Sequence, residues 1–254
     1  MNRYRHLAVI VCVLVLFGPG IPGLLWAQER PLLIYGPDGA FAPMKECAEL
    51  FSLKSGIETK VTTAPGAAWI RQARQEADII YEETEFGLTQ FMGDYPCLVD
   101  EKTRTSLYPR PAGILVRKGN PKRIGSIADL AREGVYLLDV NGSGQIGLWE
   151  DVAGLKGVIP GIRKNIAMST TTSAEAIKRW NSLPALDAWI TFESWHQFLK
   201  DTADLIRLPK DERVYRGTAL VSTQFYKNQQ SARMFIDFLK TPECHAVFRK
   251  WGWE

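Results

Sequence analysis

Short apolar runs alternate with amphipathic helical patterns from residue 28 to residue 254. This alternation is typical of βα units built around a mainly parallel sheet. Leu32–Tyr35 is expected to form the first strand, and Gly56 the end of the helix that follows. Further strands are expected at Glu58–Thr63, Asp78–Tyr81, Val135–Val140, Asp187–Phe192 and Ala219–Thr223, and further helices at Ala67–Glu76, from Gln145, Ser173–Asn181, Gln229–Leu239 and Pro242–Lys250.

Two places in the chain break this alternation. Prolines at 109 and 111 impose an extended path before the run Gly113–Lys118. We expect the chain to leave one lobe there, with a hinge near Arg110–Gly113, and to return near Arg216–Thr218. The sequence therefore predicts an α/β protein with two hinge crossovers, in which residues 28–112 plus 216–254 form lobe I and residues 113–215 form lobe II.

Residues 1–27 have the pattern of a secretion signal, with two arginines, an apolar run from Leu7 to Phe17 and a small residue, Ala27, before the expected cut. The apolar run is shorter than the roughly 20 residues that span a bilayer. We therefore expect a protein that is exported to the periplasm and cleaved near Ala27. An uncleaved membrane anchor is the alternative.

The charge balance and the cysteine and histidine content restrict which partners, disulfides and metal sites the protein can have. Removal of the signal leaves 29 Lys and Arg residues against 28 Asp and Glu residues, and this balance disfavours a nucleic-acid partner. Cys47, Cys97 and Cys244 allow at most one internal disulfide, with three pairings open. They lack metal-ligand spacing, as do His196 and His245, so we expect no metal and no other cofactor.

Small and hydroxyl residues occur where four predicted strands lead into helices. Backbone N–H groups at helix N-termini attract anions, and small residues let a ligand approach. Helix capping alone is the alternative for each turn taken singly. The four turns are Gly36–Ala40, Ala64–Ala67, Asn141–Gly144 and Thr170–Ser173. The chain has no Gly-x-Ser-x-Gly elbow, phosphate loop or HExxH motif, so it is not expected to be an enzyme.

Several segments together resemble the accessory colonization factor proteins, a branch of the molybdate- and sulfate-type periplasmic binding proteins. The resemblance implies the type II periplasmic-binding fold, whose two α/β lobes close on an oxyanion, a small carboxylate or a phosphorylated compound. Some members of the family act as surface antigens. The segments are Tyr35–Gly39, Asn141–Asp151, Leu186–Trp189, Ser194–His196, Phe235–Leu239 and Trp251–Trp253.

The same resemblance implies which residues contact the ligand. The binding loops of the molybdate-type proteins fall on Gly39, Ala40, Gly66, Ala67, Ser143, Gly144, Thr172, Ser173, Thr191 and Phe192, and the loop after the third strand adds Glu83 and Thr84. Small neutral residues are expected after that strand, but Glu82 and Glu83 stand there instead. If these carboxylates face the cleft, a bare dianion is disfavoured, because an unpaired like charge costs free energy.

These observations predict a solute receptor that captures a small anionic ligand and passes it to the membrane permease of an ABC transporter. The alternative is an exported adhesin or antigen, with a possible homodimer, that uses the same fold as an interaction surface. Three tryptophans, Trp149, Trp189 and Trp195, suit either a pocket wall or the hydrophobic core.

Overall fold

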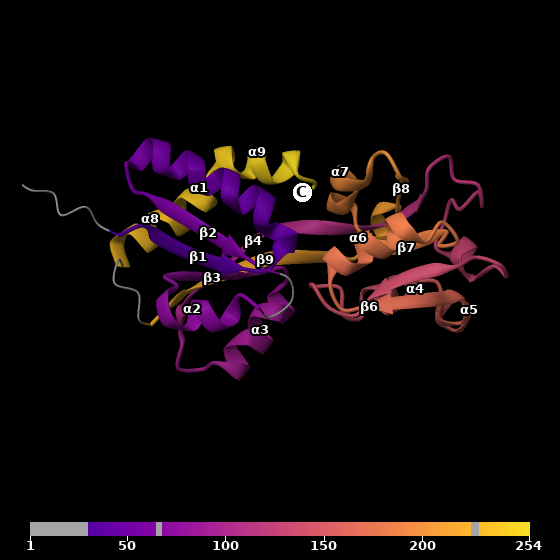
Figure 1. Ribbon diagram of the computed structural model, residues 1–254, viewed down its shortest axis with the longest axis horizontal. Coiled ribbons are helices and arrows are strands. Elements are labelled where there is room, and N and C mark those ends of the chain that lie inside the picture. Colours follow the sequence, from indigo (N-terminus) through magenta and orange to yellow (C-terminus); the bar gives the residue numbers. More distant parts are fainter. Residues whose placement is uncertain (1–29, 65–67, 225–228) are drawn as a thin grey trace, which may run out of the picture.

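The computed structural model describes residues 30–64, 68–224 and 229–254. The predicted export signal, and Gly66 and Ala67, lie outside these residues. Two groups of strands and helices lie side by side (Figure 1). The strands follow the order β2-β1-β3-β9-β4-β7-β5-β6, and β8 pairs with β4. Their bounds are β1 (Leu32–Gly36), β2 (Thr59–Thr63), β3 (Ile79–Glu82), β4 (Val99–Arg117), β5 (Leu137–Val140), β6 (Ile166–Thr170), β7 (Ala188–Phe192), β8 (Ala203–Arg207) and β9 (Tyr215–Thr223).

Helices cover both groups of strands. They are α1 (Phe41–Ser55), α2 (Ile70–Glu76), α3 (Glu85–Asp94), α4 (Leu148–Gly154), α5 (Ile159–Asn165), α6 (Ser173–Ser182), α7 (His196–Leu199), α8 (Gln229–Leu239) and α9 (Pro242–Lys250), with 3-10 turns η1 (Asp38–Ala40), η2 (Ala128–Ala131), η3 (Glu193–Trp195) and η4 (Lys210–Glu212). No helix in the described ranges is long and apolar enough to cross a bilayer.

The first group of strands carries helices on both faces because its side chains alternate. Leu32 and Ile34 of β1 pack with α1, α8 and α9, whereas Tyr35 packs on the opposite face with α2 and α3. Figure 1 shows α1, α8 and α9 on one side of these strands and α2 and α3 on the other. Gly56 ends α1 in the left-handed conformation, at a φ of 73°, as the sequence predicts.

The second group of strands surrounds one hydrophobic core. Trp180 and Trp189 are fully buried in it, and Trp195 is 6% exposed. Two of the three tryptophans weighed from the sequence, Trp189 and Trp195, are therefore core residues, while Trp149 is only partly buried at the edge of this core.

Strands β4 and β9 run from one group to the other. β4 pairs antiparallel with β9 as far as Pro111 and then pairs with β7 and β8 from Ala112 onward. The sequence predicts a mainly parallel sheet, and this prediction is wrong at the centre of the sheet. There β4 and β9 cross between the lobes in opposite directions and therefore pair antiparallel. The change of partner falls beside the predicted hinge, and the lobe bounds at 112, 113 and 216 stay a prediction.

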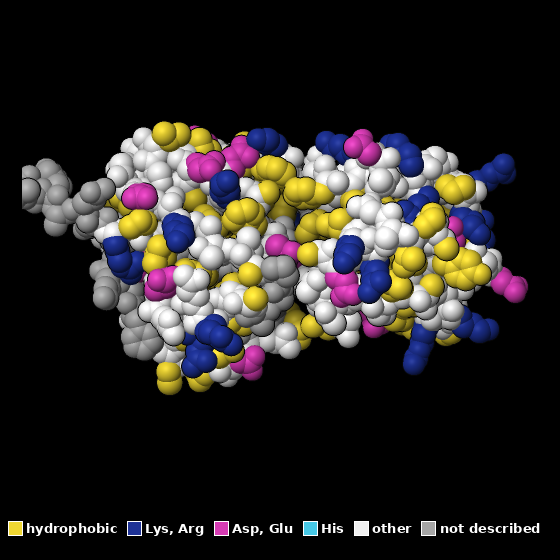
Figure 2. Space-filling view, in the orientation of Figure 1, with side chains coloured by type: hydrophobic (Ala, Val, Ile, Leu, Met, Phe, Trp, Pro, Cys, Tyr) yellow, Lys and Arg dark blue, Asp and Glu magenta, His cyan; other side chains and the backbone are white. Residues whose placement is uncertain are grey.

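Contacts from the C-terminus also join the two groups. Trp251 stacks on Phe198 with ring centroids 5.8 Å apart, and Arg213 forms an ion pair with Glu254 over 3.0 Å. Arg216 of β9 forms an ion pair with Asp151 of α4. Figure 2 shows apolar side chains gathered at the junction between the groups. These contacts hold the lobes together on one side of the cleft.

The sequence-based prediction lacks strands β6 and β8 and helices α3, α5 and α7, and the remaining differences are shifts of bounds. The helix expected from Gln145 begins at Leu148, because Gly147 before it has a left-handed φ of 70°. The last strand begins at Tyr215, four residues early. All three described cysteines are free thiols, with Cys97 exposed and the Cys47 sulfur 3.9 Å from the carbonyl oxygen of Cys244.

Candidate functional site

Arg110 is the centre of the candidate site. It lies on β4 where the strand passes between the lobes, and its side chain is fully buried. The guanidinium lies over the Phe192 ring, 3.9 Å from its centroid, and 4.9 Å from the Trp253 ring centroid. Its Nη2 donates to the carbonyl and Oε2 of Glu83, both over 3.3 Å. Among the described residues, no acceptor reaches Nε or Nη1.

Glu83 fills the space between Arg110 and the turn after β1. Its Oε1 accepts from the Gly39 N–H over 2.9 Å, and the side chain is 1% exposed. Burial raises the pKa of Glu83 to about 7, although the Arg110 charge opposes that rise. A Cβ at position 39 would lie 2.4 Å from the Glu83 carboxyl carbon, so only glycine lets the carboxylate approach this N–H.

Two more carboxyl groups surround this ion pair. Burial raises the pKa of Glu82 to about 8, and the Glu83 charge adds to the shift. Burial also raises the pKa of Asp38, whose Oδ1 has no partner in the described part of the chain. Burial lowers the pKa of Arg110. Because Glu83 and Asp38 share one guanidinium and Glu82 faces the Glu83 charge, the site favours the neutral acid form of at least one of the three carboxyl groups.

The second lobe approaches Glu83 through the loop after β5. Ser143 and Gly144 there have left-handed φ angles of 48° and 71°. A Cβ at position 144 would lie 2.9 Å from both the Glu83 Cβ and the Thr84 Cγ2. A cavity of about 220 Å³ opens beside this contact, lined by Pro37, Trp69, Ile70, Glu82, Glu83, Gly87, Gln90, Phe91, Asp94, Tyr95, Ser143, Gly144 and Ile146.

A buried polar chain fixes the second-lobe side. The Thr191 hydroxyl donates to Gln145 Oε1 over 2.8 Å, and Gln145 Nε2 donates to the Ser173 hydroxyl over 3.1 Å. The Ser173 N–H then donates to the Ser143 hydroxyl over 3.1 Å. This chain ties β7, the loop after β5 and the start of α6 into one rigid wall.

The structure distributes the predicted ligand-binding residues over both lobes. Gly39, Glu83, Ser143 and Gly144 meet at or beside the cavity. Phe192 contacts Arg110, and the predicted position Ala40 is buried at the start of α1. The remaining described residues of the set, Thr84, Thr172, Ser173 and Thr191, form helix caps or the polar chain. Their contact with ligand stays a prediction.

Sequence reasoning missed two residues of the site. It placed Arg110 only in a hinge. The two prolines that flank Arg110 hold this segment extended, and a basic residue in such a segment between the lobes was a signal for an anion-binding role. It gave Gln145 no role. Nothing local marks that glutamine, because its partners Thr191 and Ser173 are 46 and 28 residues away.

Thr172 provides a first test of these hydroxyl roles. Its Oγ1 caps α6 by accepting from the Glu175 N–H over 3.1 Å. Thr172→Ala should therefore lower the free energy of unfolding by about 1 kcal/mol, as loss of an N-cap usually does. Urea melts measure this loss, and Thr172→Ser should restore most of it. If both variants match the parent, the hydroxyl does not cap the helix.

The raised carboxyl pKa values predict a pH dependence of stability. In the unfolded chain the pKa of Glu82 and Glu83 is about 4.5, whereas in the fold it is about 8 and about 7. Between these values the folded state holds more protons, so the free energy of unfolding falls as the pH rises from about 4.5 to about 8. The melting temperature should fall over this range by at least about 3 °C. Glu82→Gln should reduce the fall in melting temperature with pH. Glu101→Gln, at an exposed position, should leave that fall unchanged. An equal fall in the parent protein and both variants would contradict the assignment of the pH dependence to these buried carboxyl groups.

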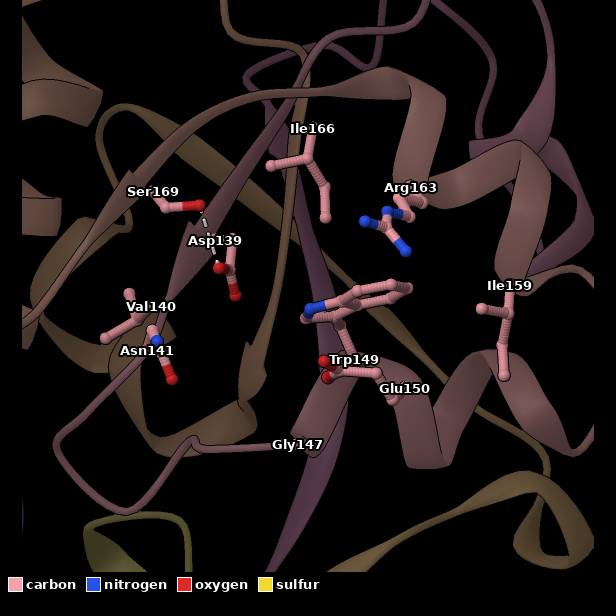
Figure 3. Close-up of a pocket in the computed structure, with 10 residues that line it drawn as sticks. All are labelled: Asp139, Val140, Asn141, Gly147, Trp149, Glu150, Ile159, Arg163, Ile166 and Ser169. Atoms are coloured by element: carbon pink, nitrogen blue, oxygen red, sulfur yellow. Dashed lines mark hydrogen bonds between the residues drawn. The ribbon is translucent and has the colours of Figure 1, made fainter.

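A larger concavity of about 520 Å³ lies on the outside of the second lobe. Figure 3 shows Trp149 at its centre, Arg163 on one side and Asp139 with Ser169 on another. Asp139 accepts from the Ser169 hydroxyl over 2.9 Å. All of its lining residues come from one lobe, so closure of the lobes cannot enclose it. We therefore place the candidate site in the smaller cavity, where buried charges from the first lobe meet the second.

Comparison with solved structures shows which proteins share this architecture. PEB3 with bound L-phospholactate matches with a TM-score of 0.80 and 29% identity, over 88% of this chain and 99% of that one. PEB3 from Campylobacter jejuni matches with a TM-score of 0.79 and 28% identity, over the same shares. A periplasmic molybdate-binding protein from Azotobacter vinelandii, at 13% identity, shares the fold with a TM-score of 0.67, over 88% of this chain and 98% of that one.

These matches confirm the α/β periplasmic-binding fold and the resemblance to the molybdate and sulfate group. A comparison with curated proteins finds no match. The family model of bacterial extracellular solute-binding proteins matches residues 32–254. That range includes Arg110, Glu83 and both sides of the cavity. The chain therefore belongs to the bacterial extracellular solute-binding protein family.

Proposed function

We propose that this protein is a periplasmic receptor that captures a small anionic ligand between its lobes and delivers it to the permease of an ABC transporter. One observation carries the proposal: Arg110 is buried at the junction of the lobes with Nε and Nη1 unpaired in the described residues. An unpaired buried donor costs free energy, and an anion that accepts from both nitrogens would remove that cost.

The surroundings of Arg110 favour some anions over others. The cavity of about 220 Å³ suits a small molecule. Asp38, Glu82 and Glu83 disfavour a compact dianion such as sulfate, because each ionised carboxylate repels it. A phosphorylated or hydroxylated carboxylic acid fits better, since its anionic end can face Arg110 while its hydroxyl or protonated oxygens donate to the carboxylates. L-Phospholactate, which is bound to PEB3, belongs to this class.

Thermal melts against a panel of anions test the proposal. The panel contains sulfate, molybdate, phosphate, citrate and L-phospholactate. An anion present at 100 times its dissociation constant should raise the free energy of unfolding by about 2.7 kcal/mol, a shift of about 5–10 °C in melting temperature for a chain of this size. Arg163→Ala, in the outer concavity, should retain this shift. A flat response to every anion would contradict the receptor and favour the adhesin.

A further inference from the structure

The donors that would hold an anion in this cleft already serve a carboxylate of the protein. Glu83 accepts from the Gly39 backbone N–H through one oxygen and from Arg110 through the other. Gly39 belongs to η1, directly before α1, where N–H groups and the helix dipole favour negative charge. Glu83 therefore occupies the position in which a bound anion would find its best partners.

Glu83 has little freedom to move aside. Its side chain is 1% exposed, and its carboxyl atoms lie 2.4–2.5 Å from the point that a Cβ on Gly39 would occupy. From the second lobe, a Cβ on Gly144 would be 2.9 Å from the Glu83 Cβ. Because both positions are glycines, the backbone on either side approaches the Glu83 side chain closely and leaves it little room to move. An anion that enters the cavity meets Glu83 in place.

The charges around Glu83 cannot neutralise a second anion. Arg110 is the cation that faces it, and the acidic groups near it are Asp38 of η1, Glu82 of β3 and the buried phenol of Tyr81. The second lobe adds Ser143 and Gly144 to the cavity, and both are uncharged. An incoming anion would therefore share one guanidinium with a fixed carboxylate.

We propose that the protein takes up one proton with each anion that it binds, and that Glu83 holds this proton. The inference rests on the proposed function. A proton from solvent adds to the Glu83 carboxylate and converts it to a neutral carboxylic acid, with no other bond broken. The new O–H donates to an oxygen of the bound anion, and the Arg110 charge is left to the anion. The raised pKa of Glu83, about 7, makes this uptake accessible near neutral pH.

Calorimetric titration with L-phospholactate at pH 8 tests the inference, because the phosphate group is then fully ionised in solution and releases no proton on binding. Titrations in two buffers with different ionisation enthalpies give the number of protons taken up per anion. We expect a value close to one for the parent protein. The affinity should fall about tenfold for each pH unit above the pKa of Glu83, as expected for one linked proton.

Two variants identify the group that holds the proton. Glu83→Gln should bind without proton uptake and without the decline in affinity above pH 7. Glu101→Gln, at an exposed position outside the cavity, should retain the uptake. Binding without proton uptake in the parent protein would overturn the inference and leave the receptor function standing. Uptake that survives in Glu83→Gln would also overturn it. A lack of heat and of thermal shift with every anion would instead contradict the proposed function.

Discussion

Replacement of Arg110 by alanine is expected to weaken the binding of L-phospholactate at least about 30-fold, since loss of one partner of a buried charge pair costs about 2–5 kcal/mol. The variant also removes the guanidinium from between Phe192 and Trp253. Calorimetric titration measures the affinity. Arg110→Lys should bind with intermediate strength, because an ammonium keeps the charge and loses the planar set of donors.

The same substitution should change stability in a pH-dependent way. Without Arg110, Glu83 would be buried and ionised at pH 8 without a cation, a state that costs about 3–5 kcal/mol. At pH 6 the loss should be smaller, because the raised pKa of Glu83 lets it bind a proton in the folded state. Urea melts at the two pH values measure the difference.

Arg117 provides a matched control for Arg110. It lies on the same strand, its guanidinium is 3.9 Å from the Trp180 ring centroid, and it donates to backbone carbonyl groups of Leu186 and Leu183. It lies away from the cavity. Arg117→Ala should therefore lower stability without changing the affinity for L-phospholactate. If both variants lose affinity equally, the effect reflects general destabilisation and Arg110 is not the anion partner.

Gly144→Ala is expected to weaken binding about tenfold or more by keeping the lobes apart. The added methyl would lie 2.9 Å from atoms of Glu83 and Thr84, closer than packed carbon atoms allow. The second lobe would have to move back from the first. X-ray scattering with saturating L-phospholactate should then give a larger radius of gyration than that of the parent protein.

Gly147→Ala is the control for the backbone strain that Gly144→Ala introduces. Gly147 has a φ of 70°, close to the 71° of Gly144, but a Cβ there would have no atom of the described residues within 4 Å. Both variants should lose a similar amount of stability, about 1 kcal/mol, from the left-handed conformation. Only Gly144→Ala should lose affinity. An equal loss of affinity in both would show that strain in the loop, and not contact between the lobes, controls binding.

The sequence by itself determined the βα alternation, the break in it near residues 110–113, and the turns after β1 and β5, which lie beside the cavity. These features are encoded locally. Helices Gln229–Leu239 and Pro242–Lys250 were predicted with the bounds that the structure shows, because apolar spacing marks the first and the Thr241 cap followed by Pro242 marks the second. Gly39 and Gly144 were selected as small residues beside a ligand, and both lie against Glu83.

Only the tertiary structure decided how charge is arranged in the cleft. Arg110 and Glu83 are 27 residues apart, and the aromatic rings that enclose Arg110 come from β7 and from the C-terminus. The sequence showed Glu82 and Glu83 as consecutive carboxylates, a pattern that a solvated turn also produces. Burial, and the cation that burial brings beside Glu83, set the pKa and the role of that carboxylate. Both are properties of a packed environment assembled from distant segments, so no local pattern could reveal them.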